Sequence, residues 1–137
     1  VKKLTLELGG KSPNIVFADA DLDAAVRGAM NGIFYGKGEV CAAGSRLLVE
    51  QSIYDDFVGR LAERAKKLVP ADPLDPKTRL GALVNEKQMN TVLGYVETGL
   101  KEGAKLVAGS GAAPFQSGLG VAGRSIKRTT PSTMSSM

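Results

Sequence analysis

The sequence is organised around one stretch, Gly36-Lys37-Gly38-Glu39-Val40-Cys41-Ala42-Ala43-Gly44-Ser45-Arg46. This stretch holds the only cysteine of the chain, and small residues stand on both sides of the thiol. Its three glycines let the backbone turn sharply and approach a ligand closely. A core cysteine usually stands within a run of large apolar residues. The setting of Cys41 therefore favours a thiol that another molecule can reach over an inert small hydrophobe.

Upstream of this stretch, two strands and a helix are predicted. Polar and apolar residues alternate over 3–8, which is typical of a half-buried strand, and residues 14–17 predict a second short strand. Asp21 is a candidate N-cap for the clearest amphipathic helix of the chain, which should end at Tyr35-Gly36. The apolar residues of this helix recur at helical spacing: Leu22, Ala25, Val26, Ala29, Met30, Ile33 and Phe34.

Downstream, the alternation of strands and helices continues. Residues 46–50 predict a buried strand, and a helix follows with an apolar face made by Ile53, Phe57, Leu61, Ala65 and Leu68. Three prolines make 70–76 a loop. Asn85 is a candidate N-cap for a third helix, and 104–108 predict a last strand. This order predicts an α/β fold, a mostly parallel sheet with covering helices.

The pattern stops near Gly109. The residues beyond it are mostly Ser, Gly, Ala, Thr, Pro and basic side chains, with no period of a helix or a strand. We therefore expect one domain over 1–108 and a divergent, disordered tail over 109–137. The chain begins with Val1 and continues as if in the middle of a strand, so we interpret it as a piece of a longer protein.

Composition excludes several classes of function. The net charge is +4 and no basic helix is present, which argues against a nucleic-acid partner. No secretory signal or apolar run near 18 residues is seen, so we expect no membrane contact and a cytoplasmic location, where a single cysteine stays reduced. The chain has no histidine, which excludes Ser-His-Asp triads, Cys-His pairs and histidine-rich metal sites. A general base must be a carboxylate, a lysine, a tyrosine or a water.

Two motifs carry a family resemblance. The first is Leu6-Glu7-Leu8-Gly9-Gly10-Lys11-Ser12-Pro13, and the second is Gly38-Glu39-Val40-Cys41 followed by Gly44-Ser45-Arg46. Their order, content and separation resemble those of the aldehyde dehydrogenase superfamily, over residues 1–108. The resemblance implies that this chain is part of the catalytic domain of such an enzyme. Full-length members of the family are homo-oligomers.

The resemblance also implies a reaction and its residues. The Cys41 thiolate would attack an aldehyde to form a thiohemiacetal, and loss of a hydride to NAD or NADP would leave a thioester. Glu7 would be the general base, and the backbone N–H of Cys41 one donor to the oxyanion. Leu8 and Gly9 would lie near the nicotinamide, and Gln88 near the cofactor ribose. No metal is implied.

Each of these residues also has a structural interpretation. Glu7 is also explained as the exposed residue of an alternating strand, Gln88 as a first-turn helix residue, and Arg46 as an anchor that binds backbone carbonyls. Gly10-Lys11-Ser12 is not a P-loop, because Thr5 stands where the first glycine is required. Lys37 departs from the family pattern, and its charge either lowers the pKa of the thiol or faces water.

Two alternatives to a dehydrogenase remain open. The competing interpretation is a non-catalytic, truncated remnant that only packs against a partner. An esterase-like fragment that needs only Cys41 and Glu7 ranks third, because half of the family's oxyanion hole lies outside this sequence. Because the family's cofactor site draws on segments outside this sequence, we expect the chain alone to lack dehydrogenase activity. Uncovered apolar edges also predict aggregation.

Overall fold

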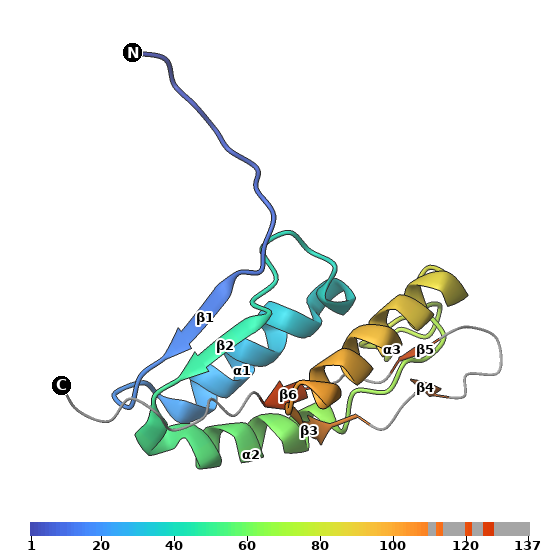
Figure 1. The fold of residues 1–137 in the computed structure, drawn as a ribbon. Helices are drawn as coiled ribbons and strands as arrows, with labels where there is room; N and C mark the ends of the chain where they lie inside the picture. Colours follow the sequence, from blue (N-terminus) through green and yellow to red (C-terminus); the bar gives the residue numbers. More distant parts are fainter. Residues whose placement is uncertain (110–111, 114–119, 122–124, 128–137) are drawn as a thin grey trace. The chain divides into compact units, whose positions relative to one another are not determined.

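The computed structural model of the chain describes residues 1–109, 112–113, 120–121 and 125–127. The chain divides into two units, Val1–Arg64 and Ala65–Met137. The elements of the first unit are β1 (Pro13–Val16), α1 (Leu22–Phe34), the 3-10 turn η1 (Tyr35–Gly38), β2 (Arg46–Val49), the 3-10 turn η2 (Gln51–Ile53) and α2 (Tyr54–Ala65) (Figure 1).

A parallel strand pair joined by a helix forms the centre of the first unit. Strands β1 and β2 pair in parallel, with Asn14 opposite Leu47 and Val16 opposite Val49. Parallel neighbours need a crossover connection, and α1 supplies it, lying against the pair in Figure 1. The predicted α/β class is confirmed here, and the two strands lie at the expected places.

Helix α1 begins and ends as the sequence predicts. The Asp21 carboxylate accepts a 3.0 Å hydrogen bond from the backbone N–H of Ala24, which satisfies one of the free donors of the first turn. The last helical residue is Phe34, and the N–H of Tyr35 still bonds to the carbonyl of Asn31. The chain therefore leaves α1 directly before the cysteine stretch.

The core of this unit comes from β1, α1 and α2. Its members are Val16, Val26, Ala29, Phe57 and Leu61, of which Val26 and Phe57 are fully buried. Outside the core, Arg60 links the two helices. Its guanidinium donates two hydrogen bonds to Asp56, at 2.8 and 2.9 Å, and one to Asp23, at 3.2 Å.

The first twelve residues do not form the predicted strand. No helix or strand is assigned to residues 1–12, and Leu4, Leu6 and Leu8 are 79%, 63% and 72% exposed. The segment extends away from β1 (Figure 1). Alternation makes one face apolar, but a strand also needs a hydrogen-bonded neighbour, and no described residue pairs with this segment. The prediction over 3–8 is wrong for this structure for that reason.

The second unit contains α3 (Glu86–Lys101), β3 (Lys105–Ala108), β4 (Ala112–Ala113), β5 (Gly120–Val121) and β6 (Ser125–Lys127). The predicted cap of α3 is confirmed, because the Asn85 side chain accepts a 2.9 Å hydrogen bond from the N–H of Gln88. Strand β3 pairs antiparallel with β6, and β4 with β5, so among the strands that the structure describes the parallel pair is β1 with β2.

Strand β3 is therefore not the last strand. Three short strands lie within 109–137, where the composition predicts a tail without regular structure. They escaped prediction because two or three residues are too few to show a period. The rest of the expected tail falls on residues outside those the structure describes. Within the described residues, no helix combines the length and apolar character needed to span a bilayer.

Candidate active site

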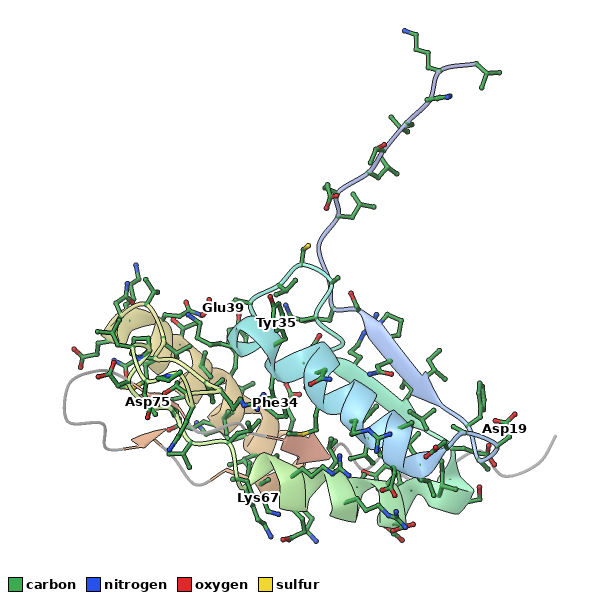
Figure 2. The ribbon with its side chains drawn as sticks, turned by 180° about the vertical axis from the view of Figure 1, so that it is seen from behind. Asp19, Phe34, Tyr35, Glu39, Lys67 and Asp75 are labelled. Atoms are coloured by element: carbon green, nitrogen blue, oxygen red, sulfur yellow. The ribbon has the colours of Figure 1, made fainter. Side chains whose placement is uncertain are left out.

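A tight reversal carries the chain from α1 into the cysteine loop. Three successive residues, Gly36, Lys37 and Gly38, have φ angles of 56°, 64° and 77°. Gly38 is also tightly packed, since a Cβ there would lie 3.0 Å from the carbonyl oxygen of Ile33. The reversal closes with a 3.2 Å hydrogen bond from the N–H of Glu39 to the carbonyl of Gly36. Figure 2 shows Phe34, Tyr35 and Glu39 at this end of α1.

The other side of the loop is held by backbone hydrogen bonds. The N–H of Ala43 donates to the carbonyl of Val40 at 2.9 Å, and the N–H of Gly44 donates to the carbonyl of Gly32 in α1, also at 2.9 Å. Ala43 is buried, whereas Cys41 is exposed and its thiol is free. The loop therefore presents the thiol outward from a fixed base.

Arg46 ties this loop to the end of the first motif. Its Nε donates a 2.8 Å hydrogen bond to the carbonyl of Lys11, and its N–H donates a 3.1 Å bond to the carbonyl of Ser12. The interpretation of Arg46 as an anchor through backbone carbonyls is confirmed. Gly10 also adjoins the loop, because a Cβ on it would lie 3.7 Å from the carbonyl oxygen of Cys41. Residues 10–12, in the second half of the first motif, are thus placed beside the cysteine loop.

Glu7, Leu8 and Gly9 themselves remain open. All three are exposed, and a Cβ on Gly9 would have nothing within 4 Å. Glu7 makes no hydrogen bond or ion pair with the described residues. The structure brings the second half of the first motif, residues 10–12, to the cysteine loop. The Glu7 side chain is exposed.

Gln88 lies in the first turn of α3, in the second unit. The backbone N–H of Gln88 donates a hydrogen bond to the side chain of Asn85, and Gln88 is exposed. Leu8 and Gly9, in the first unit, are likewise exposed. No group of three or more His, Cys, Asp or Glu residues in the described chain is arranged to hold a metal ion.

A pocket that sequence reasoning missed opens beside the cysteine. Its volume is about 490 Å³, and its lining is mostly small or apolar: Asn31, Gly32, Tyr35, Val40, Ala42 and Ala43. Val40 and Ala42 are the chain neighbours of Cys41. The sequence does show that Tyr35 follows an apolar helix face directly before the cysteine loop. Only the fold shows that Tyr35 and the loop residues Val40 and Ala42 line the same pocket.

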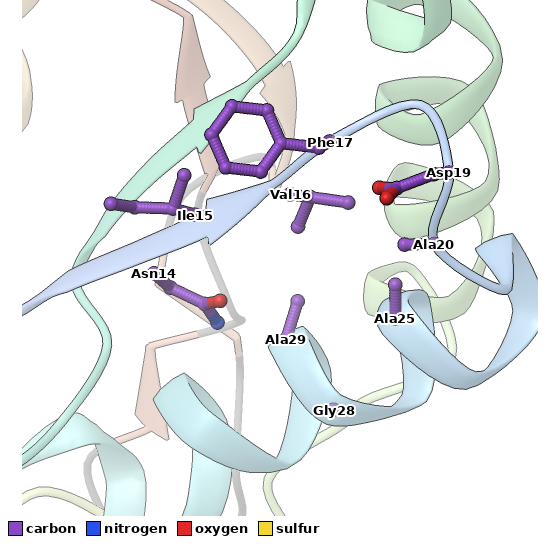
Figure 3. A pocket seen from close by; sticks show the side chains of 9 residues that line it. All are labelled: Asn14, Ile15, Val16, Phe17, Asp19, Ala20, Ala25, Gly28 and Ala29. Atoms are coloured by element: carbon purple, nitrogen blue, oxygen red, sulfur yellow. The ribbon is translucent and has the colours of Figure 1, made fainter.

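A second pocket, of about 290 Å³, lies between β1 and α1 (Figure 3). Asn14, Val16 and Ala29 are among the residues that line it, and Asp19 is its only charged one. It contains neither of the motif residues Glu7 and Cys41. We therefore assign it no part in the chemistry of the thiol.

Lys37 does not simply face water. Its ammonium lies 3.3 Å from Oε2 of Glu39, and its side chain is 28% exposed. The partner of Lys37 is thus Glu39, which stands two residues before Cys41. The sequence alone did not predict this ion pair, because it depends on the reversal that brings the two side chains together.

Comparison with known proteins decides the family. Residues 1–132 match the family model described as the aldehyde dehydrogenase family. This chain belongs to the aldehyde dehydrogenase family. The resemblance carried by the two motifs is thereby confirmed. The match continues to residue 132, and the division into a domain over 1–108 and a tail over 109–137 stays a prediction.

Individual relatives agree with this assignment. Retinal dehydrogenase 2 of Homo sapiens is 54% identical over 109 residues, which are 80% of this chain and 21% of the relative. Aldehyde dehydrogenase 1A1 of Oryctolagus cuniculus is 57% identical over 111 residues, 81% of this chain and 22% of the relative. The chain spans about a fifth of the length of the curated relatives it matches.

Solved structures show the same family. The aldehyde dehydrogenase KauB from Pseudomonas aeruginosa superposes with a TM-score of 0.83 at 52% identity, covering 89% of this chain and 25% of that one. An indole-3-acetaldehyde dehydrogenase in complex with NAD+ gives a TM-score of 0.80 at 52% identity, covering 85% and 24%. The α/β architecture of this chain is therefore that of a part of these enzymes.

Proposed function

We propose that this chain carries the catalytic cysteine of an oxidoreductase that oxidises aldehydes with NAD or NADP as acceptor. The observation that carries the proposal is the exposed Cys41 thiol, presented by a loop that the Glu39 to Gly36 hydrogen bond holds before the cysteine and that Gly44 and Arg46 anchor after it. Membership of the family supports it.

In the proposed reaction, the Cys41 thiolate attacks the carbonyl carbon of an aldehyde. A C–S bond forms, the π electrons of the carbonyl move to its oxygen, and the N–H of Cys41 donates to that oxyanion. The pocket beside Val40 and Ala42 suits an apolar group of the aldehyde.

Glu7 is the proposed general base, which takes the proton of the thiol or of the water that later releases the acid. Its open carboxylate, just before a segment that is bonded to the cysteine loop, supports this role. When bound, the nicotinamide of the cofactor accepts a hydride. Leu8, Gly9 and Gln88 are proposed to contact that cofactor, and the NAD+ complex of a relative supports its class.

The test uses the purified chain. We expect Cys41 to react with a thiol probe, and we measure NAD and NADP binding and nicotinamide reduction with a panel of aldehydes. Cys41→Ala should lose thiol reactivity and any turnover, whereas Ser45→Ala, which keeps the backbone bonds of the same loop, should not. A Cys41 that stays unreactive in the folded chain would contradict the proposal.

A second candidate is a non-catalytic piece that packs against a partner. The exposed leucines Leu4, Leu6 and Leu8 favour it, since they offer an apolar strip that no described residue covers. Hydrolysis of an activated ester that disappears in Cys41→Ala would favour a reactive thiol over this remnant. Ester hydrolysis that is equal in both chains would favour the remnant.

Two further assignments accompany the proposal. We propose a cytoplasmic location, supported by a relative from Mus musculus named aldehyde dehydrogenase, cytosolic 1. We also propose that the domain ends near residue 108. Limited proteolysis with mass spectrometry tests this boundary, because first cleavages within 109–137 are expected and first cleavages within 13–108 would contradict it.

A further inference from the structure

We propose that Lys37 is a positioning residue for Cys41, which acts by pairing with Glu39 and so keeps an uncompensated carboxylate from opposing the thiolate. The proposal deepens the proposed function, because it rests on Cys41 as the nucleophile.

The backbone conformation of Lys37 is unusual for a residue with a side chain. Lys37 has a φ of 64° between two glycines, in the left-handed region where a side chain is disfavoured. Glycine would adopt the same conformation without strain. A lysine in place of a third glycine adds an ammonium group at this turn, and the contact of that group is the basis of the proposal.

The contact of that side chain is an ion pair. Its Nζ lies 3.3 Å from Oε2 of Glu39, and the two side chains are 28% and 46% exposed. The reversal that brings them together is closed by the hydrogen bond from the N–H of Glu39 to the carbonyl of Gly36. The reversal thus brings Lys37 and Glu39 close enough for their side chains to form this ion pair.

The pair lies close to the thiol along the chain. Two residues span at most about 7 Å between Cα atoms, so the Cα atom of Glu39 lies within that distance of the Cα atom of Cys41. A nearby carboxylate raises the pKa of a thiol, and a cation that neutralises the carboxylate removes that effect. All other charged residues, including Arg46, are the same in the Lys37 and Glu39 variants below.

The experiment measures the rate at which Cys41 reacts with a neutral alkylating probe at pH 7 and low salt. Lys37→Gly keeps the left-handed turn and removes the ammonium, and we expect a rate about two- to threefold lower, as a unit charge at this range implies. Lys37→Gly combined with Glu39→Gln should restore the rate. In 1 M salt the single variant should match the parent, because screening then acts within about 3 Å.

A control variant removes a charge elsewhere. Arg27→Gln, in the first half of α1 and exposed, should leave the rate unchanged. A Lys37→Gly rate equal to or above that of the parent would overturn the proposal. So would a slower rate that persists in 1 M salt or in the double variant, because it would show a purely structural effect of the loop. The readout needs neither cofactor nor aldehyde, so its failure is distinguishable from failure of the proposed dehydrogenase function.

Discussion

The guanidinium Nε of Arg46 lies 2.8 Å from the carbonyl oxygen of Lys11 and donates a hydrogen bond to it. This bond joins the loop that presents Cys41 to the segment that follows Glu7. The acceptor is a backbone atom, so the contact depends on the chain path of residues 10–12 and not on the side chain of Lys11.

Arg46→Ala should therefore destabilise the first unit by about 1 kcal/mol, the net contribution of one hydrogen bond. Lys11→Ala is the matched control, because it keeps the acceptor and should change little. Urea denaturation measures both. Equal losses in the two variants would show that the Lys11 side chain, rather than its carbonyl, matters.

Phe57 is fully buried among core residues that include Val26 and Leu61. Phe57→Ala should cost about 3–5 kcal/mol, because it removes buried apolar surface and leaves a cavity. Phe17→Ala makes the same chemical change at a residue that is 62% exposed, and should cost under about 1 kcal/mol. Comparable urea midpoints for the two variants would contradict the position of the core.

Two glycines should respond in opposite directions to the same substitution. Gly38→Ala places a Cβ 3.0 Å from a carbonyl oxygen at a φ of 77°, and should destabilise the chain by at least about 1–2 kcal/mol. Gly59→Ala, inside α2 where a Cβ meets nothing within 4 Å, should stabilise it by up to about 1 kcal/mol. Thermal unfolding measures the pair, and a loss at Gly59 would argue against the described α2.

Glu50 links the end of β2 to the turn after β1. The backbone N–H of Ala18 and the hydroxyl of Ser52 each donate a 2.8 Å hydrogen bond to its carboxylate. These bonds, that from Ala18 most of all, hold the pKa of Glu50 below its ordinary value. A lowered pKa in the folded state contributes stability that is present above the ordinary pKa of a glutamate. That stability is lost as the pH falls through the lowered value.

Glu50→Gln should therefore be less stable than the parent at pH 7, and the difference should shrink as the pH falls below about 4. Asp56, whose pKa is lowered chiefly by its hydrogen bond with Arg60, leaves part of the acid dependence in place. Glu97→Gln, at an exposed site in α3, is the control. Urea midpoints across pH measure the effect, and a difference that grows toward acid pH would reverse the assignment.

The sequence by itself determined the local elements and the family. The spacing of apolar residues from Leu22 to Phe34, with Asp21 before them, located the start of α1 at Leu22 and its end close to Tyr35, because helix period and capping are local properties. Asn85 located the start of α3 for the same reason. The motifs around Glu7 and Cys41 were sufficient for the family, since residue types at a fixed separation are read without coordinates.

Only the tertiary structure decided those features that depend on contacts between different segments of the chain. The alternation over 3–8 predicted a strand, yet a strand exists only where a neighbour accepts its hydrogen bonds, and no described residue does so. The ion pair of Lys37 with Glu39 depends on three successive positive φ angles, which no propensity predicts for a lysine. The bond of Arg46 to Lys11 joins residues 35 positions apart, and only folding brings such residues together.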